Sequence, residues 1–298
     1  NGVARHADIV LPATTPLERN DIGWSPDDTF MFPMQQAVPP VGQARSDYDI
    51  FTGIAEQMGL GDAFTEGRSE DNWIRHLYGQ FQEQLKRREE IELPDFDVFW
   101  ESGEFELPTH DNERVHLSEF RNDPVGSPLR TPSGKIEIFS ETVDDFGYDD
   151  APGHATWLEP SEWLGSPRAR NFPIHLISNQ PKTRLHSQHD PGSVSLASKV
   201  QGREPITMNS EDASSRGIQD GDVVRVFNDR GQCLAGACLS DGIRPGVVNL
   251  STGAWYDPEA PGGLDRHGNP NVLTLDKGTS KLAQGPTAHS ALVEIEKF

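Results

Sequence analysis

Residues 222–239, DVVRVFNDRGQCLAGACL, decide the fold of the second half of this chain. Val223–Asn228 is rich in β-branched and aromatic residues, and the turn residues 229–231 separate it from a second apolar run, Gln232–Leu239. A further strand is expected at Val247–Ser251, after another turn. Short strands separated by turn residues at this spacing predict a compact β-barrel.

The segments on either side extend the same pattern. Ile174–Ser178 and Ala291–Ile295 are apolar runs of strand length, and the second is placed to close the barrel. Asn209 is a favourable N-cap for one helix over Ser210–Arg216, which Gly217 would end. We therefore expect a barrel of short strands with a single helix.

Residues 1–150 show a different pattern, in which expected strands and helices alternate with long irregular segments. Apolar residues at helical spacing follow good capping residues in two places. This half therefore reads as α/β. The expected elements are a buried strand at Ile9–Leu11, a helix capped by Asp47 with its last apolar position at Met58, a longer helix beginning at Ser69, loops over residues 89–133 and a strand at Lys135–Phe139.

The composition excludes several classes of protein. The chain has 298 residues with 26 Lys and Arg against 47 Asp and Glu, which gives a formal net charge of −21. Such a charge argues against binding a nucleic acid polymer through a basic face. Two Cys are too few for a disulfide scaffold, a four-Cys zinc site or a Cys-held iron–sulfur cluster. No apolar run approaches the ~18 residues of a membrane span.

The first residues predict that the chain is a piece of a longer polypeptide. It begins Asn1-Gly2-Val3, without an initiator Met, and a segment read as a buried strand follows almost at once. A signal peptide would need a basic start, an apolar stretch and a small-residue cleavage site, and this start has none of them. The compartment therefore cannot be predicted from these residues.

The densest polar stretch is SNQPKTRLHSQ, residues 178–188, which directly follows the expected strand at 174–178. Its donors would emerge from the rigid end of a sheet. Arg184 offers a planar fork to phosphate or to the edge of a heteroaromatic ring, and the Asn, Gln, Ser and His side chains both donate and accept. The stretch predicts a polar ligand site, and a solvated loop without a ligand is the alternative.

Two Gly-containing turns are further candidates. One is HGNPN, residues 267–271, and the other is QGPTAH, residues 284–289. Glycine lets backbone amides approach a ligand closely, although plain Gly/Asn turns have the same composition. No nucleophile elbow, phosphate-binding loop or Rossmann glycine fingerprint is present in the sequence, and no His pair has convincing metal-ligand spacing. The residues alone thus indicate a polar ligand site on a β-barrel.

Several segments, taken in order along the chain, resemble molybdopterin oxidoreductases of the dimethyl sulfoxide reductase family. Within that family the resemblance is to the trimethylamine-N-oxide, dimethyl sulfoxide and biotin sulfoxide reductases, and it covers essentially the whole chain. The segments are ARHADIVLPATT at 4–15 with LERND at 17–21, TPSGKIEIFS at 131–140, RLHSQ at 184–188, DVVRVFNDRGQ at 222–232 and GTSKLAQG at 278–285.

The resemblance implies that this chain is the C-terminal part of a longer molybdenum-dependent reductase, which removes oxygen from an S-oxide or N-oxide. Residues 1–150 would be an incomplete α/β part of the catalytic body, and residues 151–298 a double-psi β-barrel that binds the molybdopterin dinucleotide. The cofactor would be molybdenum held by two molybdopterin guanine dinucleotides (bis-MGD), shared with the rest of the enzyme. A cofactor of this kind carries the redox chemistry, while the protein binds and tunes it.

The family's cofactor contacts fall on the three polar segments named above. The family's molybdenum-ligating side chain, a Ser in this group, belongs to a part of the enzyme outside these residues, so we expect no catalytic residue and no metal ligand within this chain. The resemblance implies cofactor contacts by Ser178, Asn179, Gln180, Pro181, Arg184, His186, Ser187 and Gln188 in the first segment, by His267, Gly268 and Asn269 in the second, and by Gln284, Gly285 and Pro286 in the third.

The resemblance leaves the substrate open among trimethylamine N-oxide, dimethyl sulfoxide and biotin sulfoxide, and it does not indicate the electron donor. Relatives of this group occur in the periplasm or the cytoplasm, of which the periplasm is preferred. Two other hypotheses stay open. One is a stand-alone double-psi barrel that acts as a binding module without catalysis, and the other is a molybdenum enzyme for another substrate, such as formate or nitrate.

Overall fold

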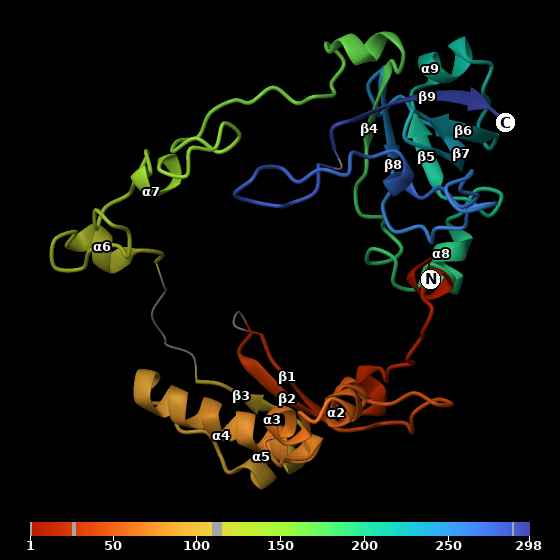
Figure 1. Ribbon diagram of the computed structural model, residues 1–298. Coiled ribbons are helices and arrows are strands. Elements are labelled where there is room, and N and C mark those ends of the chain that lie inside the picture. The colour runs from red at the N-terminus through yellow and green to blue at the C-terminus, as the bar shows by residue number, and fades with distance from the viewer. Residues whose placement is uncertain (1, 26–27, 109–114, 288) are drawn as a thin grey trace. The chain divides into compact units, whose positions relative to one another are not determined.

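The computed structural model describes residues 2–25, 28–108, 115–287 and 289–298 (Figure 1). These residues form two compact units. One unit contains the short helix α1 (Gly2–His6) together with Asp123–Phe298, and the other consists of Ala7–Asn122. The expected domain division at residue 150 came from the resemblance and stays a prediction.

The larger unit is built on a closed β-barrel, in which the strands follow the order β4-β8-β5-β7-β6-β9. The neighbours β4 and β8 are parallel, as are β5 and β7, and the remaining neighbours are antiparallel. Closure confirms the predicted barrel and leaves no open sheet edge. The strands are β4 (Ile174–Ile177), β5 (Pro205–Met208), β6 (Val223–Phe227), β7 (Gln232–Leu239), β8 (Val247–Leu250) and β9 (Ala291–Lys297).

The sequence predicted all of these strands except β5. That strand is short and begins at Pro205, and a proline in a run usually demotes the run to an edge or a turn. Burial alternates along β6, in which Val224 and Val226 are fully buried. The barrel core consists of Ile174, Leu176, Ile206, Met208, Ala213, Ile218, Val224, Val226, Cys233, Ala235, Ala237, Val248, Leu250, Leu273, Ala291, Val293 and Ile295.

Short helices connect the strands of this unit. Asn209 caps α9 (Ser210–Ser215) as predicted, because its side chain accepts a hydrogen bond from the Glu211 amide at 2.9 Å. The expectation of a single helix is wrong, since α8 (Ser193–Ala197) and the 3₁₀ helix η3 (Pro270–Val272) also occur. Both are too short to show an apolar period in the sequence.

The segment that precedes the barrel in the sequence is mostly irregular, with α7 (Glu141–Asp144) and the 3₁₀ helix η2 (Pro167–Arg170). The strand expected at Lys135–Phe139 is wrong: Phe139 makes one isolated bridge to His154, and Ile138 is 88% exposed. An apolar run becomes a strand only where a neighbouring strand pairs with its backbone.

The smaller unit combines a three-stranded antiparallel sheet, in the order β1-β2-β3, with several helices. Its core contains Met31, Tyr78, Leu85, Leu93 and Phe99, and the rings of Tyr78 and Phe99 stack with centroids 4.8 Å apart. Burial, together with the charge of Asp95, raises the pKa of Tyr78 to about 12. The elements are η1 (Pro16–Glu18), β1 (Asp21–Gly23), β2 (Phe30–Met34), α2 (Asp47–Gln57), α3 (Gly61–Thr65), α4 (Glu70–Glu89), α5 (Phe96–Ser102), β3 (Phe105–Glu106) and α6 (Ser118–Asn122).

Two of the expectations for this unit are confirmed and the others are wrong. The helices α2 and α4 form where predicted, and Ser69 caps α4 by accepting from the Asn72 amide. Asp47 is not the cap of α2 but its first residue, because the Ser46 side chain accepts from the Asp49 amide instead. Residues 89–133 are not only loops, because α5, β3 and α6 lie within them. The buried strand at Ile9–Leu11 is wrong as well, since Ile9 is 78% exposed and these residues adopt no regular structure.

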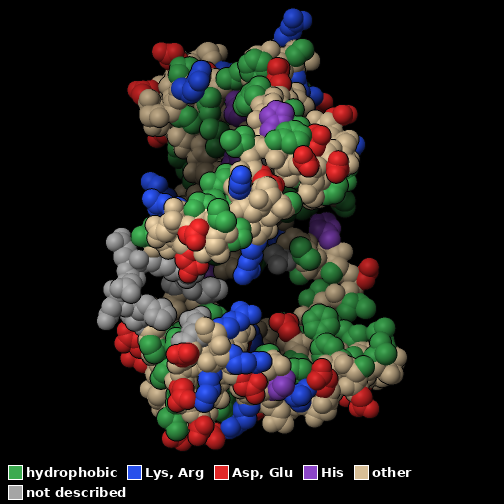
Figure 2. Space-filling model, turned by 90° about the vertical axis from the view of Figure 1, so that its left-hand side faces the viewer, with side chains coloured by type: hydrophobic (Ala, Val, Ile, Leu, Met, Phe, Trp, Pro, Cys, Tyr) green, Lys and Arg blue, Asp and Glu red, His purple; other side chains and the backbone are tan. Residues whose placement is uncertain are grey.

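The surface carries the excess of acidic residues. On the face drawn in Figure 2, Asp and Glu side chains are scattered among other side chains rather than gathered in one patch. Within the described residues, no helix is both long enough and apolar enough to cross a membrane.

Candidate functional site

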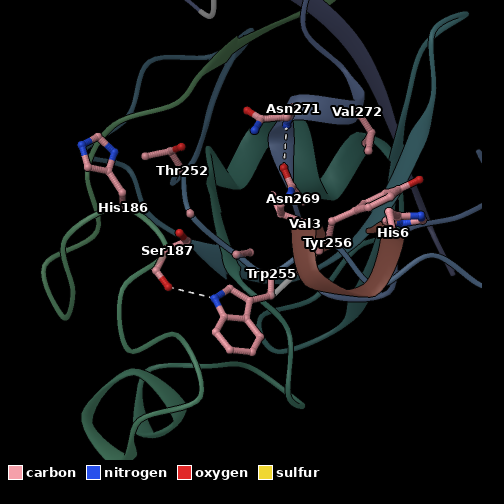
Figure 3. A pocket seen from close by; sticks show the side chains of 13 residues that line it. Val3, His6, His186, Ser187, Thr252, Trp255, Tyr256, Asn269, Asn271 and Val272 are labelled. Atoms are coloured by element: carbon pink, nitrogen blue, oxygen red, sulfur yellow. Dashed lines mark hydrogen bonds between the residues drawn. The ribbon is translucent and has the colours of Figure 1, made fainter. Parts of the chain in front are cut away.

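A pocket of about 660 Å³ opens on the barrel unit (Figure 3). It contains three residues that the sequence predicted for the site, His186, Ser187 and Asn269. A larger hollow of about 910 Å³, between residues 10–12 and α2 in the other unit, contains none of them. The pocket is lined by Gly2, Val3, His6, His186, Ser187, Thr252, Gly253, Ala254, Trp255, Tyr256, Asn269, Asn271 and Val272.

The parallel pairing of β4 with β8 creates the floor of this site. Because the strands run in the same direction, the loops that follow them leave the barrel at the same end. Asn179, in the loop after β4, accepts a hydrogen bond from the Thr252 amide at 2.9 Å with its carbonyl, and its side-chain oxygen accepts from Ser251 Oγ at 2.8 Å. The two loops are therefore joined where they begin.

The exposed part of the first loop is held by Gln180. Its Oε1 accepts from the His186 amide at 3.0 Å, while its Nε2 lies 2.8 Å from His186 Nδ1. His186 has a φ of +48°, a left-handed conformation that costs energy for a residue with a side chain. The turn places His186 and Ser187 on the pocket, and the Ser187 carbonyl accepts from the indole Nε1 of Trp255 at 2.8 Å (Figure 3).

Arg184 lies beneath this loop and does not line the pocket. Its side chain is 0% exposed, and all five N–H groups of the guanidinium have acceptors inside the protein. Nε donates to the carbonyl of His186, and Nη2 donates to Glu204 and to the carbonyl of Thr252. No N–H group of this guanidinium is therefore free for a ligand in this arrangement. The expected ligand contact of Arg184 stays a prediction.

The second predicted segment folds around a buried carboxylate. Asp265 is 0% exposed, and its Oδ2 accepts from the amides of His267 at 3.3 Å, Gly268 at 2.9 Å and Asn269 at 2.8 Å. Its Oδ1 accepts from the Asp257 amide at 2.7 Å. This turn presents Asn269 to the pocket, whereas Gly268 packs inside it at a φ of +86°.

The third predicted segment does not reach the pocket. Gln284, Gly285 and Pro286 are exposed, and the Gln284 side chain bonds to the Ser280 carbonyl of its own loop. His289, at the end of this loop, accepts from the Ser178 amide with Nδ1 at 3.4 Å, and Ala288 lies outside the described residues. The residues absent from the pocket lining are thus Ser178, Asn179, Gln180, Pro181, Arg184, Gln188, His267, Gly268, Gln284, Gly285 and Pro286.

Sequence reasoning missed the loop after β8, which supplies Thr252–Tyr256 to the pocket. A signal was available, because STGAWYD follows one apolar strand just as SNQPKTR follows another. It also missed His6, whose ring stacks on Tyr256 with centroids 5.9 Å apart. Nothing local in the sequence brings residues this far apart together.

The residues of the site fit a flat heteroaromatic group. Trp255, Tyr256 and His6 offer ring faces, and the Asn and Ser side chains offer both donors and acceptors. None of the lining residues that the structure describes is Lys or Arg, so the pocket suits a ring better than a phosphate.

No group of three or more His, Cys, Asp or Glu side chains in the described part of the chain is arranged to hold a metal ion. The side chains that line the pocket are suited to bind and orient a polar, planar ligand. A ligand of this kind is consistent with the donors and acceptors that the two loops present.

Comparison with known proteins identifies the family. Residues 174–292, which span the barrel, match the family model described as "Molydopterin dinucleotide binding domain", and residues 1–57 match the model "Molybdopterin oxidoreductase". Over 99% of its length the chain is 48% identical to the dimethyl sulfoxide/trimethylamine N-oxide reductase of Cereibacter sphaeroides. The chain belongs to the molybdopterin oxidoreductase family. The resemblance predicted from the sequence is confirmed.

Two further relatives are similar to the same extent. The chain is 47% identical over 98% of its length to the biotin sulfoxide reductase of Cereibacter sphaeroides, and 47% identical over 99% to trimethylamine-N-oxide reductase 1 of Escherichia coli K12. It spans 36% of the first relative, 39% of the second and 35% of the third, which is little more than a third of each.

A solved structure shows the same fold. Acetylene hydratase from Pelobacter acetylenicus matches 100% of this chain and 39% of its own length with a TM-score of 0.74, at 20% sequence identity. This likeness confirms the expected fold class, an α/β portion followed by a double-psi β-barrel.

Proposed function

We propose that this chain is the cofactor-binding, C-terminal part of a molybdenum-dependent reductase that removes oxygen from an S-oxide or N-oxide. The observation that carries the proposal is an identity of 47% or 48% over nearly the whole chain to three enzymes named for such substrates. Since the chain spans little more than a third of those enzymes, the reaction belongs to the larger protein of which it would be part.

The barrel is the part that would hold the dinucleotides of bis-MGD. We place the contacts to a pterin or guanine ring on His186, Ser187 and Asn269, because these are the predicted residues that line the pocket and their side chains are polar. Trp255 and Tyr256 would add flat apolar faces that exclude water from the ring. The remaining predicted contacts, from Ser178 to Pro286, are proposed as outer contacts of the same cofactor.

The chemistry divides between the cofactor and the chain. When bound, the molybdenum centre supplies the two-electron redox chemistry. In the overall reaction the oxide takes up two electrons and two protons and leaves as the sulfide or amine together with water. The residues of this chain bind and orient the cofactor rings. We place the metal-ligating side chain and most of the substrate funnel outside these 298 residues.

The substrate, electron donor and compartment follow from the larger protein. Trimethylamine N-oxide, dimethyl sulfoxide and biotin sulfoxide are the candidate substrates, since relatives named for each are equally similar. A location in the periplasm is proposed over one in the cytoplasm.

The test is a cofactor and activity analysis of the whole protein. We expect purified protein to contain molybdenum and to release GMP on acid hydrolysis, at about two per metal, and to oxidise a reduced viologen dye when any of the three oxides is added. Protein that contains neither molybdenum nor releasable GMP after expression with molybdate would refute the proposal. Metal and nucleotide without oxide reduction would refute the substrate class alone.

A further inference from the structure

Four charged side chains form a closed ring beneath the pocket. They are Arg184, Asp190, Lys199 and Glu204, and we name them the ion ring. Their side chains are 0%, 7%, 5% and 3% exposed, so the ring is essentially out of contact with water. Arg184 lies on the loop after β4, and Glu204 directly precedes β5.

The charges of the ring alternate in sign. Arg184 pairs with Asp190 at 3.5 Å and with Glu204 at 3.1 Å, and Lys199 pairs with Asp190 at 2.7 Å and also with Glu204. Every charge therefore has two opposite neighbours, and the four sum to zero. Burial alone would raise the pKa of Asp190, but the Lys199 ammonium and the Trp255 amide outweigh it and keep that pKa below its usual value.

Burying four charges is costly, and apolar residues of the same size often stabilise a core equally well. The ring therefore needs an explanation other than core stability. Its outward hydrogen bonds supply one. Arg184 donates to the carbonyls of His186 at 3.1 Å and Thr252 at 3.0 Å, and Asp190 accepts from the Trp255 amide at 2.8 Å.

These bonds end on both walls of the pocket. His186 belongs to the loop after β4, whereas Thr252 and Trp255 belong to the loop after β8, and all three line the pocket. The loops meet so closely that a Cβ on Gly253 would lie 1.9 Å from the His186 carbonyl oxygen. A shift of either loop therefore changes the space between them.

We propose that the ion ring is the positioning device that fixes these two loops in the conformation that receives the dinucleotide. Its role toward the ligand rests on the function proposed above. None of the four residues lines the pocket. They act through the backbone of the two loops, and Lys199 acts only by holding Asp190 and Glu204 in place.

Hydrogen exchange on the cofactor-free whole protein tests the positioning role. Lys199→Met removes one cation of the ring while keeping the length of the side chain. The matched control is Lys297→Met in the same barrel, where the lysine pairs with Asp222 and is 50% exposed. The amides of His186, Thr252 and Trp255 report on the loops, because each donates a hydrogen bond in the structure.

We expect Lys199→Met to accelerate exchange of these amides by roughly 10- to 100-fold, the equivalent of one lost charge-assisted hydrogen bond. The amides of β6 should exchange as in the unmodified protein. Lys297→Met should change neither the exchange of the loop amides nor that of the β6 amides. The neutral variant Lys199→Met/Glu204→Gln should lie between Lys199→Met and the unmodified protein, because it restores charge balance in the ring. Unchanged loop exchange, or equal acceleration in the loops and β6, would overturn the positioning role.

The neutral variant also covers the case in which Lys199→Met does not fold. In that case the neutral variant must show faster exchange of the loop amides than the unmodified protein, with exchange of the β6 amides unchanged. If it does not, the proposal is refuted. The second readout is GMP released by acid from protein purified with its cofactor. We expect less from Lys199→Met and an undiminished amount from Lys297→Met. Equal release from all three would overturn the role toward the ligand. If the unmodified protein releases none, the proposed function fails, while the exchange comparison still decides the positioning role.

Discussion

Asp265→Asn is the substitution whose effect the structure defines most sharply. The carboxylate is fully buried and accepts four backbone amides, those of Asp257, His267, Gly268 and Asn269, at 2.7 to 3.3 Å. Asparagine has the same shape but only one oxygen. If that oxygen serves the three amides at Oδ2, the new NH₂ group faces the Asp257 N–H, which then has no acceptor.

The expected cost follows from the loss of charge. A hydrogen bond to a charged acceptor contributes roughly 1 kcal/mol more than one to a neutral acceptor, and an unsatisfied buried N–H costs about 1–3 kcal/mol. Three weakened bonds and one orphaned amide thus amount to about 4–6 kcal/mol. The variant no longer buries a charge, which offsets part of this, so we expect a net loss of about 3 kcal/mol.

Native-state hydrogen exchange in increasing urea measures this loss. The slowest amides of β6 and β7 give the free energy of unfolding of the barrel unit separately from the other unit. Asp241→Asn, at an exposed turn, is the matched control. A value for Asp265→Asn within about 0.5 kcal/mol of this control, the usual range of surface substitutions, would refute the reasoning.

Three further predictions concern the same barrel. Gly253→Ala should destabilise the barrel by about 2 kcal/mol or more, because the φ of this residue is +93° and the two loops must separate to admit the methyl group. The control Gly217→Ala, at a φ of +65° in open space, should cost only about 1 kcal/mol. Urea unfolding measures both losses. Glu162→Gln should cost about 3 kcal/mol at pH 7, since it breaks the buried pair with Arg230. Burial alone would raise the pKa of Glu162, but the hydrogen bonds from Arg230 and from a backbone amide outweigh burial, so the pKa lies below its usual value of 4.5. The stability that this carboxylate adds is therefore present above pH 4.5 and is lost as the pH falls through the lowered pKa. The free energies of unfolding of the unmodified protein and of Glu162→Gln, measured from pH 7 downward, should therefore converge below pH 4.5, and a constant difference between them would contradict this. Asn209→Ala should cost about 1 kcal/mol through loss of the α9 cap, measured as a lower thermal midpoint.

The sequence predicted the barrel well because its strands carry their own signals. β6 and β7 are apolar runs of strand length on either side of a turn, and Asn209 accepts from the Glu211 amide at the start of α9 without any distant partner. The strand predicted at Ile9–Leu11 failed for the opposite reason. Its composition suits a strand, but a strand also needs a pairing partner, and composition does not supply one.

The candidate site was only partly predictable for a related reason. The polar loop after β4 was visible because it follows an apolar strand, and the structure brings His186 and Ser187 of this loop to the pocket. The partner loop after β8 became part of the site through the parallel pairing of the two strands, which is a long-range feature. Arg184 was predicted as a ligand contact because a guanidinium suits phosphate, but whether its donors are free depends on Glu204 and Thr252.

The distribution of charge shows what kind of binding this unit provides. The chain has a net charge of −21, the pocket lining that the structure describes includes no Lys or Arg, and the charges of Arg184 and Lys199 are balanced inside the ion ring. A unit of this kind does not attract an anionic cofactor by its field. On the function proposed above, it would select instead by the shape of two fixed loops and by neutral donors and acceptors, and loops that are rigid before the ligand arrives lower the entropic cost of binding. The buried ring and the close approach at Gly253 provide that rigidity.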